Sequence, residues 1–388
     1  MRLTRGLSIP TIRAARTALA ALSMIEATAT EACVTPESTA KGCGALRFKA
    51  PVLVLESEYS GATSALGRLG EDGCLAEVAD VSLPHNASLR IAHGRPFVLD
   101  DDGGLLIAIR PDALAVSGTF AAYATRPEER PNPHDVDVDE AGRLWVTRYD
   151  LGSLAIIEAN GAFGEAVDLS DLDPDGIPEM DAIRVHGDRA YVAFESLDRT
   201  MFPWLPKRAG GVAILDVAPP HTRRGIIDLV GHNPAGRFVS MNDTGSLVAV
   251  PTPGSFYAID DEDGVDAVDL EAGTARQIVS ERALGGSVFD VAVASPTDAY
   301  ALVLGPADPN PSKVVAFNPT TGAVTGDPLI SFPAFASAGI AVVGDLVLVA
   351  DFTRGAAKIH VFDRATHEAR GEVTPKLLAP WSLLSLGP

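Results

Sequence analysis

Short runs of alternating hydrophobic and polar residues recur along the chain and predict β-strands rather than helices. One strand-like phrase occurs seven times, at intervals of between 43 and 55 residues. The seven copies begin near Asn86, Asp135, Asp181, Gly236, Asp290, Gly339 and Ser382. Every copy except the last is followed by a turn and further hydrophobic runs, so one unit is expected to hold several short strands.

Each unit is expected to form four strands. In the third unit the hydrophobic runs are 136–139, 144–147, 153–158 and 164–169, with glycine-containing turns between them. Four antiparallel strands in each of seven units predict an all-β fold, the seven-bladed β-propeller, in which the sheets surround a central channel. A pair of β-sandwiches is the alternative, but sandwiches do not repeat one phrase in this way.

The two ends of the repeat region are mismatched. The first two hydrophobic runs, 52–56 and 65–69, have no copy of the phrase before them, whereas the last copy, 380–386, has no second run after it. We therefore expect the C-terminal strand to serve as the inner strand of the first blade. That arrangement leaves no free sheet edge at the seam.

The first 33 residues differ from the rest, and we expect a signal or lipoprotein leader over 1–33, a linker over 34–49 and the propeller over 50–388. Basic residues precede a small apolar stretch at 17–25, as in a secretory signal. Cys33 follows a small residue, which makes it the candidate for lipidation and for attachment to a membrane. The alternatives are a cytosolic leader and a wrongly assigned start codon.

The possible pairing of the cysteines indicates the cellular compartment in which the protein folds. If Cys33 is lipidated or removed, Cys43 and Cys74 remain as the one possible disulfide pair. Such a bond would tie the N-terminal segment to the first blade in an oxidising compartment. The alternative is two unpaired thiols.

The chain is acidic, with 51 acidic residues against 31 basic ones and a formal charge of −20. Such a field repels phosphate backbones, so nucleic acid is not expected as a partner. Because no run approaches about eighteen apolar residues, no membrane-spanning helix is expected either. We expect a monomer that meets a membrane only through a lipid on Cys33.

Two repeats carry a specific resemblance. Residues 144–149 followed by 153–157, and 190–193 followed by 212–216, resemble the YVTN-type repeat of bacterial exported propellers. The resemblance covers about residues 50–388 and implies a propeller at the cell surface or in the periplasm. It implies no particular activity, because most members of that family have no assigned role. Later blades match the repeat only at its hydrophobic positions.

Propeller topology places the loops that enter the inner strands, and those that follow the second strands, on one face around the channel mouth. Loops on a rigid scaffold commonly carry function. His85 and His134 occupy equivalent places in adjacent blades, and together with Asp135 they suit a transition metal or acid–base catalysis. The alternative is that each histidine only caps a turn. The ligand-face candidates are His85, Asn86, His134, Asp135, Arg148, Tyr149, Glu179, Asp181 and Trp204.

A second candidate site is an acidic loop. Asp171, Asp173 and Asp175 alternate and are followed by Gly176, as in the first half of an EF-hand-type calcium loop. The twelfth position is Ala182 rather than Glu, so the match is incomplete. Ca²⁺ is therefore the one cofactor that the sequence predicts, against the alternative of a solvated acidic turn. The segment 260–264 is a weaker relative, interpreted as a surface loop.

The longest loop of the fourth blade is the insertion 197–210. It carries Met201, Phe202 and Trp204 between prolines. These residues either form a hook that contacts a partner, since aromatic anchors contribute strongly to binding, or fold back over the blade.

The chain lacks the common catalytic signatures, among them G-x-S-x-G, H-E-x-x-H, C-x-x-C and the Walker A loop. We therefore predict an exported propeller that is not an enzyme and that binds a small molecule or a protein partner at the channel face, with Ca²⁺ as a stabilising ion. The alternative is a metal-assisted lactonase or lyase with its site at the channel mouth. Its candidate residues are Asn86, His134, Asp135, Glu179 and Asp181. A purely structural surface protein is the third hypothesis.

Overall fold

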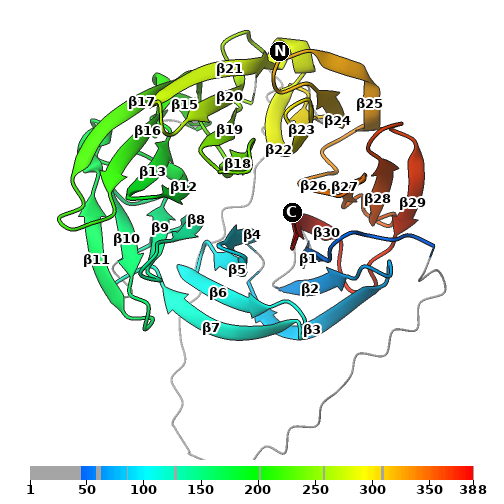
Figure 1. The fold of residues 1–388 in the computed structure, drawn as a ribbon, viewed down its shortest axis with the longest axis horizontal. Helices are drawn as coiled ribbons and strands as arrows, with labels where there is room; N and C mark the ends of the chain where they lie inside the picture. Colours follow the sequence, from blue (N-terminus) through cyan, green and yellow to red (C-terminus); the bar gives the residue numbers. More distant parts are fainter. Residues whose placement is uncertain are drawn as a thin grey trace, which may run out of the picture. The chain divides into compact units, whose positions relative to one another are not determined.

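The computed structural model describes residues 45–57, 63–84, 86–125, 129–200, 202–256, 258–306 and 310–387, without the side chains of 79–82. These residues lie within one compact unit, 38–388. They form seven four-stranded antiparallel sheets that surround a channel (Figure 1). The prediction of an all-β, seven-bladed β-propeller is therefore confirmed. No helix in the described part of the chain combines the length and the apolar character that a membrane crossing requires.

Each blade has an inner strand beside the channel and a second strand paired with it. The inner strands are β30 (Pro380–Ser385), β4 (Ala87–Ala92), β8 (Pro133–Val138), β12 (Met180–His186), β18 (Val239–Ser240), β22 (Ser287–Ser295) and β26 (Ile340–Val343). The second strands are β1 (Val52–Ser57), β5 (Arg95–Asp100), β9 (Leu144–Arg148), β13 (Arg189–Phe194), β19 (Leu247–Thr252), β23 (Asp298–Leu304) and β27 (Leu346–Asp351).

The third and outer strands complete each blade. The third strands are β2 (Ser64–Leu69), β6 (Leu105–Arg110), β10 (Ser153–Ile157), β16 (Ala209–Asp216), β20 (Gly264–Asp269), β24 (Ser312–Phe317) and β28 (Lys358–Asp363). The outer strands are β3 (Leu75–Leu83), β7 (Ala115–Ala121), β11 (Phe163–Asp168), β17 (Arg223–His232), β21 (Thr274–Ser280), β25 (Val324–Phe332) and β29 (Ala369–Val373). Four short elements lie in the loops. β14 (Leu197–Asp198) pairs with β15 (Leu205–Pro206), the 3₁₀ helix η1 (Ser170–Leu172) follows β11, and α1 (Glu281–Leu284) joins β21 to β22.

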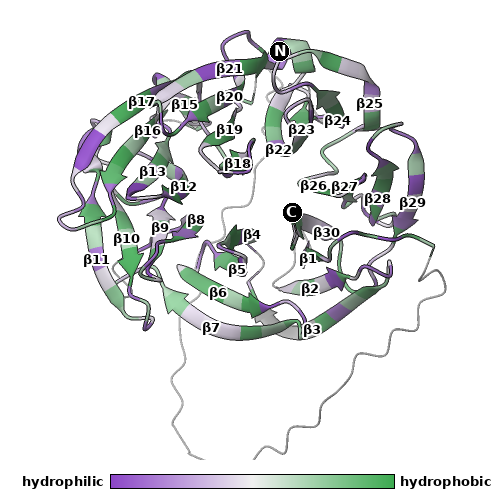
Figure 2. Cartoon of the chain, in the orientation of Figure 1, coloured by the Kyte–Doolittle hydropathy of each residue, from purple (hydrophilic) through white to green (hydrophobic). Residues whose placement is uncertain are grey.

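The core consists of the faces between blades. Second and third strands such as β9 and β10 are buried on both faces, whereas outer strands such as β11 are largely exposed. Figure 2 shows the same contrast, with polar residues on the outer strands β17 and β29. The buried hydrophobic side chains form one cluster at each of the seven junctions between neighbouring blades. Each blade therefore depends on both neighbours for its stability.

Recurring aspartates in the phrase link the inner strands of adjacent blades. The Asp135 carboxylate accepts hydrogen bonds from the backbone N–H groups of Val136 (2.9 Å) and of Ile183 in the next blade (2.9 Å). Asp137 repeats this pattern, and its Oδ2 accepts the N–H of Val185 at 2.7 Å. Because buried N–H groups need partners, much of the aspartate in the repeated phrase is structural.

The ring closes as predicted. β30 pairs antiparallel with β1, so the C-terminal strand is the inner strand of the first blade. The segment that leads to β30 is held by Glu56 and Glu77, which accept hydrogen bonds from the N–H groups of residues 376–378. Burial raises the pKa of Glu56 to about 8, with Leu378 and Glu77 as smaller influences. Glu56 therefore favours the neutral carboxylic acid at neutral pH.

Several predictions fall on residues outside the described part of the chain. The leader 1–33 with Cys33, most of the linker, His85, Cys43 and Met201 all belong to this group. Cys74 lies in a disulfide bond. Export, lipidation and the pairing of Cys43 with Cys74 stay predictions.

Candidate functional site

His134 is the centre of a polar cluster on the channel face. It lies in β8, and its Nδ1 is 2.7 Å from Oδ1 of Asp181 in the next blade. Its ring stacks on Tyr149, with 4.1 Å between the ring centroids. Burial favours the neutral imidazole, but attraction to Asp181 and Asp101 outweighs burial and raises the pKa of His134 above 6.5. Asp181 thus orients the ring, and no described residue forms a hydrogen bond to Nε2.

Tyr149 extends this cluster toward Glu195. The Tyr149 hydroxyl donates a hydrogen bond to Glu195 Oε2 at 2.9 Å. Burial, reinforced by the nearby charge of Asp181, raises the pKa of Glu195 well above its ordinary value. Burial also raises the pKa of Asp101, to about 7, although His134 and Arg90 oppose the effect. Such concentrations of perturbed groups are typical of functional sites, although structural networks produce them as well.

The insertion between β13 and β16 lies over this cluster. Arg199, which follows β14, forms ion pairs with Glu179 (2.6 Å) and Asp150 (3.0 Å). Its guanidinium also lies over the rings of Tyr149 and Trp204, 5.6 and 4.6 Å from their centroids. Trp204 is therefore partly packed onto the blade, whereas Phe202 is 78% exposed. A partner that contacts this loop stays a prediction.

Three other sequence candidates, Arg148, Asp135 and Asn86, form no hydrogen bond or ion pair with the described His134. Arg148 is buried and bonded to Glu129 and to the backbone of Ser153. Asp135 links two blades, as described above, and Asn86 is exposed. The structure thus joins His134, Tyr149 and Asp181 directly and leaves Arg148 outside the group.

The acidic loop 171–175 contains carboxylates that are paired with cations of the protein. Asp171 forms a bidentate ion pair with Arg223, at 2.6 and 2.7 Å. Asp173 and Asp175 share Lys207, whose Nζ lies 2.6 and 3.2 Å from their carboxylate oxygens. A calcium ion would have to displace Lys207 from this loop. Ca²⁺ at these three aspartates stays a prediction.

A metal at the channel mouth would need at least three converging donors. In the described part of the chain, one such group has its donor atoms within 4.8 Å of one another, and it consists of Asp260, Asp263 and Glu281. His134 and Asp181 are not part of it.

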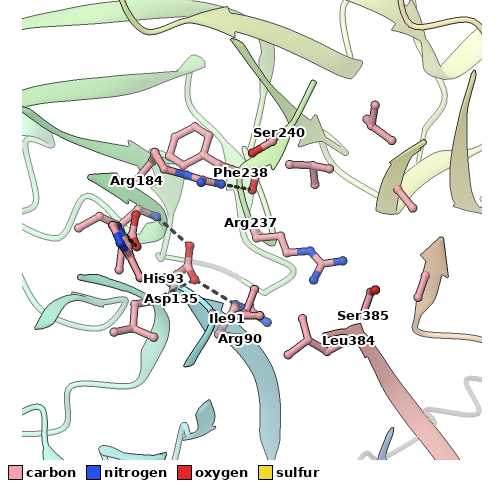
Figure 3. A pocket seen from close by; sticks show the side chains of 18 of the residues that line it. Arg90, Ile91, His93, Asp135, Arg184, Arg237, Phe238, Ser240, Leu384 and Ser385 are labelled. Atoms are coloured by element: carbon pink, nitrogen blue, oxygen red, sulfur yellow. Dashed lines mark hydrogen bonds and ion pairs between the residues drawn. The ribbon is translucent and has the colours of Figure 1, made fainter. Parts of the chain in front are cut away.

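The channel itself holds a cavity of about 540 Å³, lined by the inner strands of all seven blades. Arg90, Arg184 and Arg237 line it, and Figure 3 shows Arg237 extending into the channel. Arg90 lies 3.3 Å from Asp135, and Arg184 donates a hydrogen bond to the carbonyl of Phe238 at 3.1 Å. These arginines are not among the candidates predicted from the sequence, although three of the seven copies of the phrase contain an arginine.

Among the three arginines, Arg237 has the fewest hydrogen-bond partners in the described part of the chain. Its closest carboxylate oxygen belongs to Asp290, at 4.0 Å, and no described residue accepts a hydrogen bond from its guanidinium. The Asp290 carboxylate already accepts the N–H groups of Val291 (2.9 Å) and Ile340 (3.2 Å). The guanidinium therefore keeps donors that face the cavity.

Known proteins share the fold of this chain. No protein-family model matches it, and no curated protein matches its sequence. A structure from Bacteroides uniformis, named as a putative 6-phosphogluconolactonase, covers 86% of this chain and 98% of its own, with 12% identity and a TM-score of 0.59. A Bacteroides fragilis protein of the same name covers 86% and 97%, with 13% identity and a TM-score of 0.54. Streptogramin B lyase covers 76% and 85%, with 10% identity and a TM-score of 0.52.

At these identities the similarities show a common propeller fold and no more. The resemblance to the YVTN-type repeat stays a prediction.

Proposed function

We propose that the protein binds a small anionic molecule in its central channel. The observation that carries this proposal is Arg237, a guanidinium in the channel cavity with no hydrogen-bond acceptor among the described residues. Arginine presents five N–H donors in a planar fork that matches a carboxylate or a phosphate. A cavity of about 540 Å³ lies within the range of small-molecule sites.

The net charge of the chain and the charges inside the channel have different effects on an anion. The chain as a whole carries −20, so general attraction would not bring an anion to it. Inside the channel, however, the carboxylates of Asp135, Asp137 and Asp290 are engaged by backbone N–H groups. Their acceptor capacity is partly used, and the guanidinium of Arg237 retains donors for a ligand.

Titration calorimetry with 6-phosphogluconate, gluconate and inorganic phosphate tests the proposal, with glucose as the neutral comparison. We expect at least one anion to bind, and we expect Arg237→Gln to weaken that binding by about tenfold or more, because one charge-assisted contact is lost. Arg276→Gln, an exposed change on the outer strand β21, is the matched control and should leave the affinity unchanged. Equal affinities in both variants, or no anion binding by the wild type, would refute the proposal.

A second candidate function is the hydrolysis of a small lactone, and the His134–Asp181 pair favours it. A carboxylate at Nδ1 leaves Nε2 free to act as a general base. His134 would take a proton from water, whose oxygen attacks the ester carbonyl. The ring C–O bond then breaks, and the proton passes to the departing ring oxygen to give a hydroxy acid. The names of two similar structures include lactonase, which supports a test of this chemistry.

A lactonase assay with δ-gluconolactone and its 6-phosphate tests this second function. We expect His134→Gln to lower kcat by about 100-fold or more, because general-base catalysis typically contributes that much. The wild-type rate should rise with pH through the pKa of His134, which lies above 6.5, because the base must be neutral. His186→Gln, at the end of β12, is the control. A wild-type rate equal to that of buffer alone rules out this function and leaves the anion-binding proposal intact.

A further inference from the structure

Three carboxylates from two separate segments meet at the junction of the fifth and sixth blades. Asp260 and Asp263 belong to the loop between β19 and β20, and Glu281 begins the short helix α1. Donor atoms of the three side chains all lie within 4.8 Å of one another. Both segments lie on the channel face of the propeller, since one follows a second strand and the other precedes an inner strand.

Glu281 is the unusual member of this group. It is 0% exposed, and neither carboxylate oxygen has a hydrogen-bond partner among the described residues. The fully buried hydroxyl of Ser287 lies beside this carboxylate without the geometry of a regular hydrogen bond. Burial raises the pKa of Glu281 to about 8; the Ser287 hydroxyl and the backbone of Asp260 oppose this effect, and the charges of Asp263 and Asp260 add to it. A buried carboxylate without a regular hydrogen bond or a positive neighbour is costly, so a missing partner is indicated.

The two aspartates are held so that each keeps an oxygen free. Asp260 Oδ1 accepts the N–H groups of Glu262 (2.9 Å) and Asp263 (2.7 Å), which fixes the loop. Asp263 Oδ1 is bonded to the backbone N–H and the ring Nδ1 of His232, at 2.7 and 2.8 Å. No described residue forms a hydrogen bond to Oδ2 of either aspartate.

Asp263 packs closely against a glycine. A Cβ atom at Gly254 would collide with Asp263 Oδ2, so a side chain at this position would displace the carboxylate. Gly254 also has a positive φ of 58°, which other residues rarely adopt.

The cations nearest in sequence do not neutralise the group. Arg282 follows Glu281 directly, but its Nε is bonded to Asp261 at 2.8 Å. His232 contacts only the already engaged Oδ1 of Asp263. Among the described residues, neither Asp260 nor Glu281 forms an ion pair with a lysine or an arginine.

We propose that Asp260, Asp263 and Glu281 bind a hard divalent cation, and that Ca²⁺ is the preferred ion. Four free carboxylate oxygens and the Ser287 hydroxyl provide oxygen donors, which are the ligands that Ca²⁺ takes in proteins. The site lacks thiolate and free imidazole donors, which disfavours softer metals. It is distinct from the loop 171–175, where Lys207 already occupies the carboxylates.

Thermal unfolding of the metal-stripped full chain, with and without added CaCl₂, MgCl₂ or ZnCl₂, tests the proposal. We expect Ca²⁺ to raise the Tm saturably, because it binds the native state. Glu281→Gln and Asp260→Asn should each abolish most of this rise and weaken calcium binding by calorimetry by about tenfold or more. Asp261→Asn changes an exposed carboxylate of the same loop and should keep the full response.

Two results would overturn the proposal. One is a wild-type Tm that does not change with Ca²⁺ at up to about 10 mM, well above the weakest extracellular calcium sites. The other is a calcium response that survives both Glu281→Gln and Asp260→Asn but is lost in Asp173→Asn, which would place the ion in the other loop. Asp260→Asn covers the case in which the fully buried Glu281 does not tolerate replacement.

Discussion

Ending the chain after Ala379 is expected to abolish the cooperative folding of the propeller. The truncation removes β30, which pairs with β1 and supplies the inner strand of the first blade. Leu383 belongs to the cluster between the seventh and first blades, and Leu384 to the cluster between the first and second. One strand therefore contributes to two of the seven junctions.

The expected size of the effect follows from these two leucines. Removal of one buried leucine side chain costs about 2–5 kcal/mol, and β1 would also lose its paired edge. Together these losses are comparable to the whole stability of a typical domain, about 5–15 kcal/mol.

Urea unfolding followed by circular dichroism measures this effect. The control ends the chain after Leu386, which keeps β30 and its pairing with β1. We expect the control to unfold cooperatively near the wild-type midpoint, and the longer truncation to lack a cooperative transition. A midpoint shared by both truncations would show that β30 is dispensable for the ring.

Trp145→Ala is expected to cost about 3–5 kcal/mol of unfolding free energy, the range for a large aromatic residue in a core. Trp145 is 0% exposed and packs between the third and fourth blades. Its indole Nε1 donates a hydrogen bond to Asp139 Oδ2 at 3.0 Å, and its ring meets His221 edge-on. Chemical denaturation measures the loss.

A second variant at Trp145 separates packing from the hydrogen bond, and a variant at Trp204 serves as the control. Trp145→Phe keeps much of the ring, and Asp139 Oδ2 keeps its bond to Arg143 Nε at 2.7 Å, so we expect a loss smaller than that of Trp145→Ala. Trp204→Ala changes a tryptophan that is 40% exposed and packs on Arg199, and it should cost about 1 kcal/mol or less. An equal loss from Trp145→Ala and Trp204→Ala would contradict the expected importance of the junction between the third and fourth blades.

Part of the candidate site was visible in the sequence. His134 and Tyr149 follow from their positions in loops of the channel face, and Asp181 from its position at the start of the next phrase. What the sequence could not show is that Asp181 bonds to His134, because the two are 47 positions apart and belong to different blades. Glu195 was missed because it follows a second strand without any motif around it.

The channel arginines show the same limit. Three phrases contain an arginine, but a place in or just before an inner strand says nothing about the partners of its side chain. Only the closed ring shows that Arg237 lies 4.0 Å from Asp290, a residue of the next blade, and forms no hydrogen bond with the described residues. Likewise, the segment 260–264 has the composition of a surface loop, and the fold gives two of its aspartates a third carboxylate, from Glu281.

The strands, the number of blades and the closure by the C-terminal strand could all be predicted from the amino-acid sequence. These follow from hydrophobic alternation and turn residues, which act over a few neighbouring positions and recur in every unit. The contacts between polar groups, such as His134 with Asp181 and Asp263 with Glu281, are seen only in the folded chain. Those contacts cross the junctions between blades, and the distances there depend on how whole sheets pack, which no local pattern encodes.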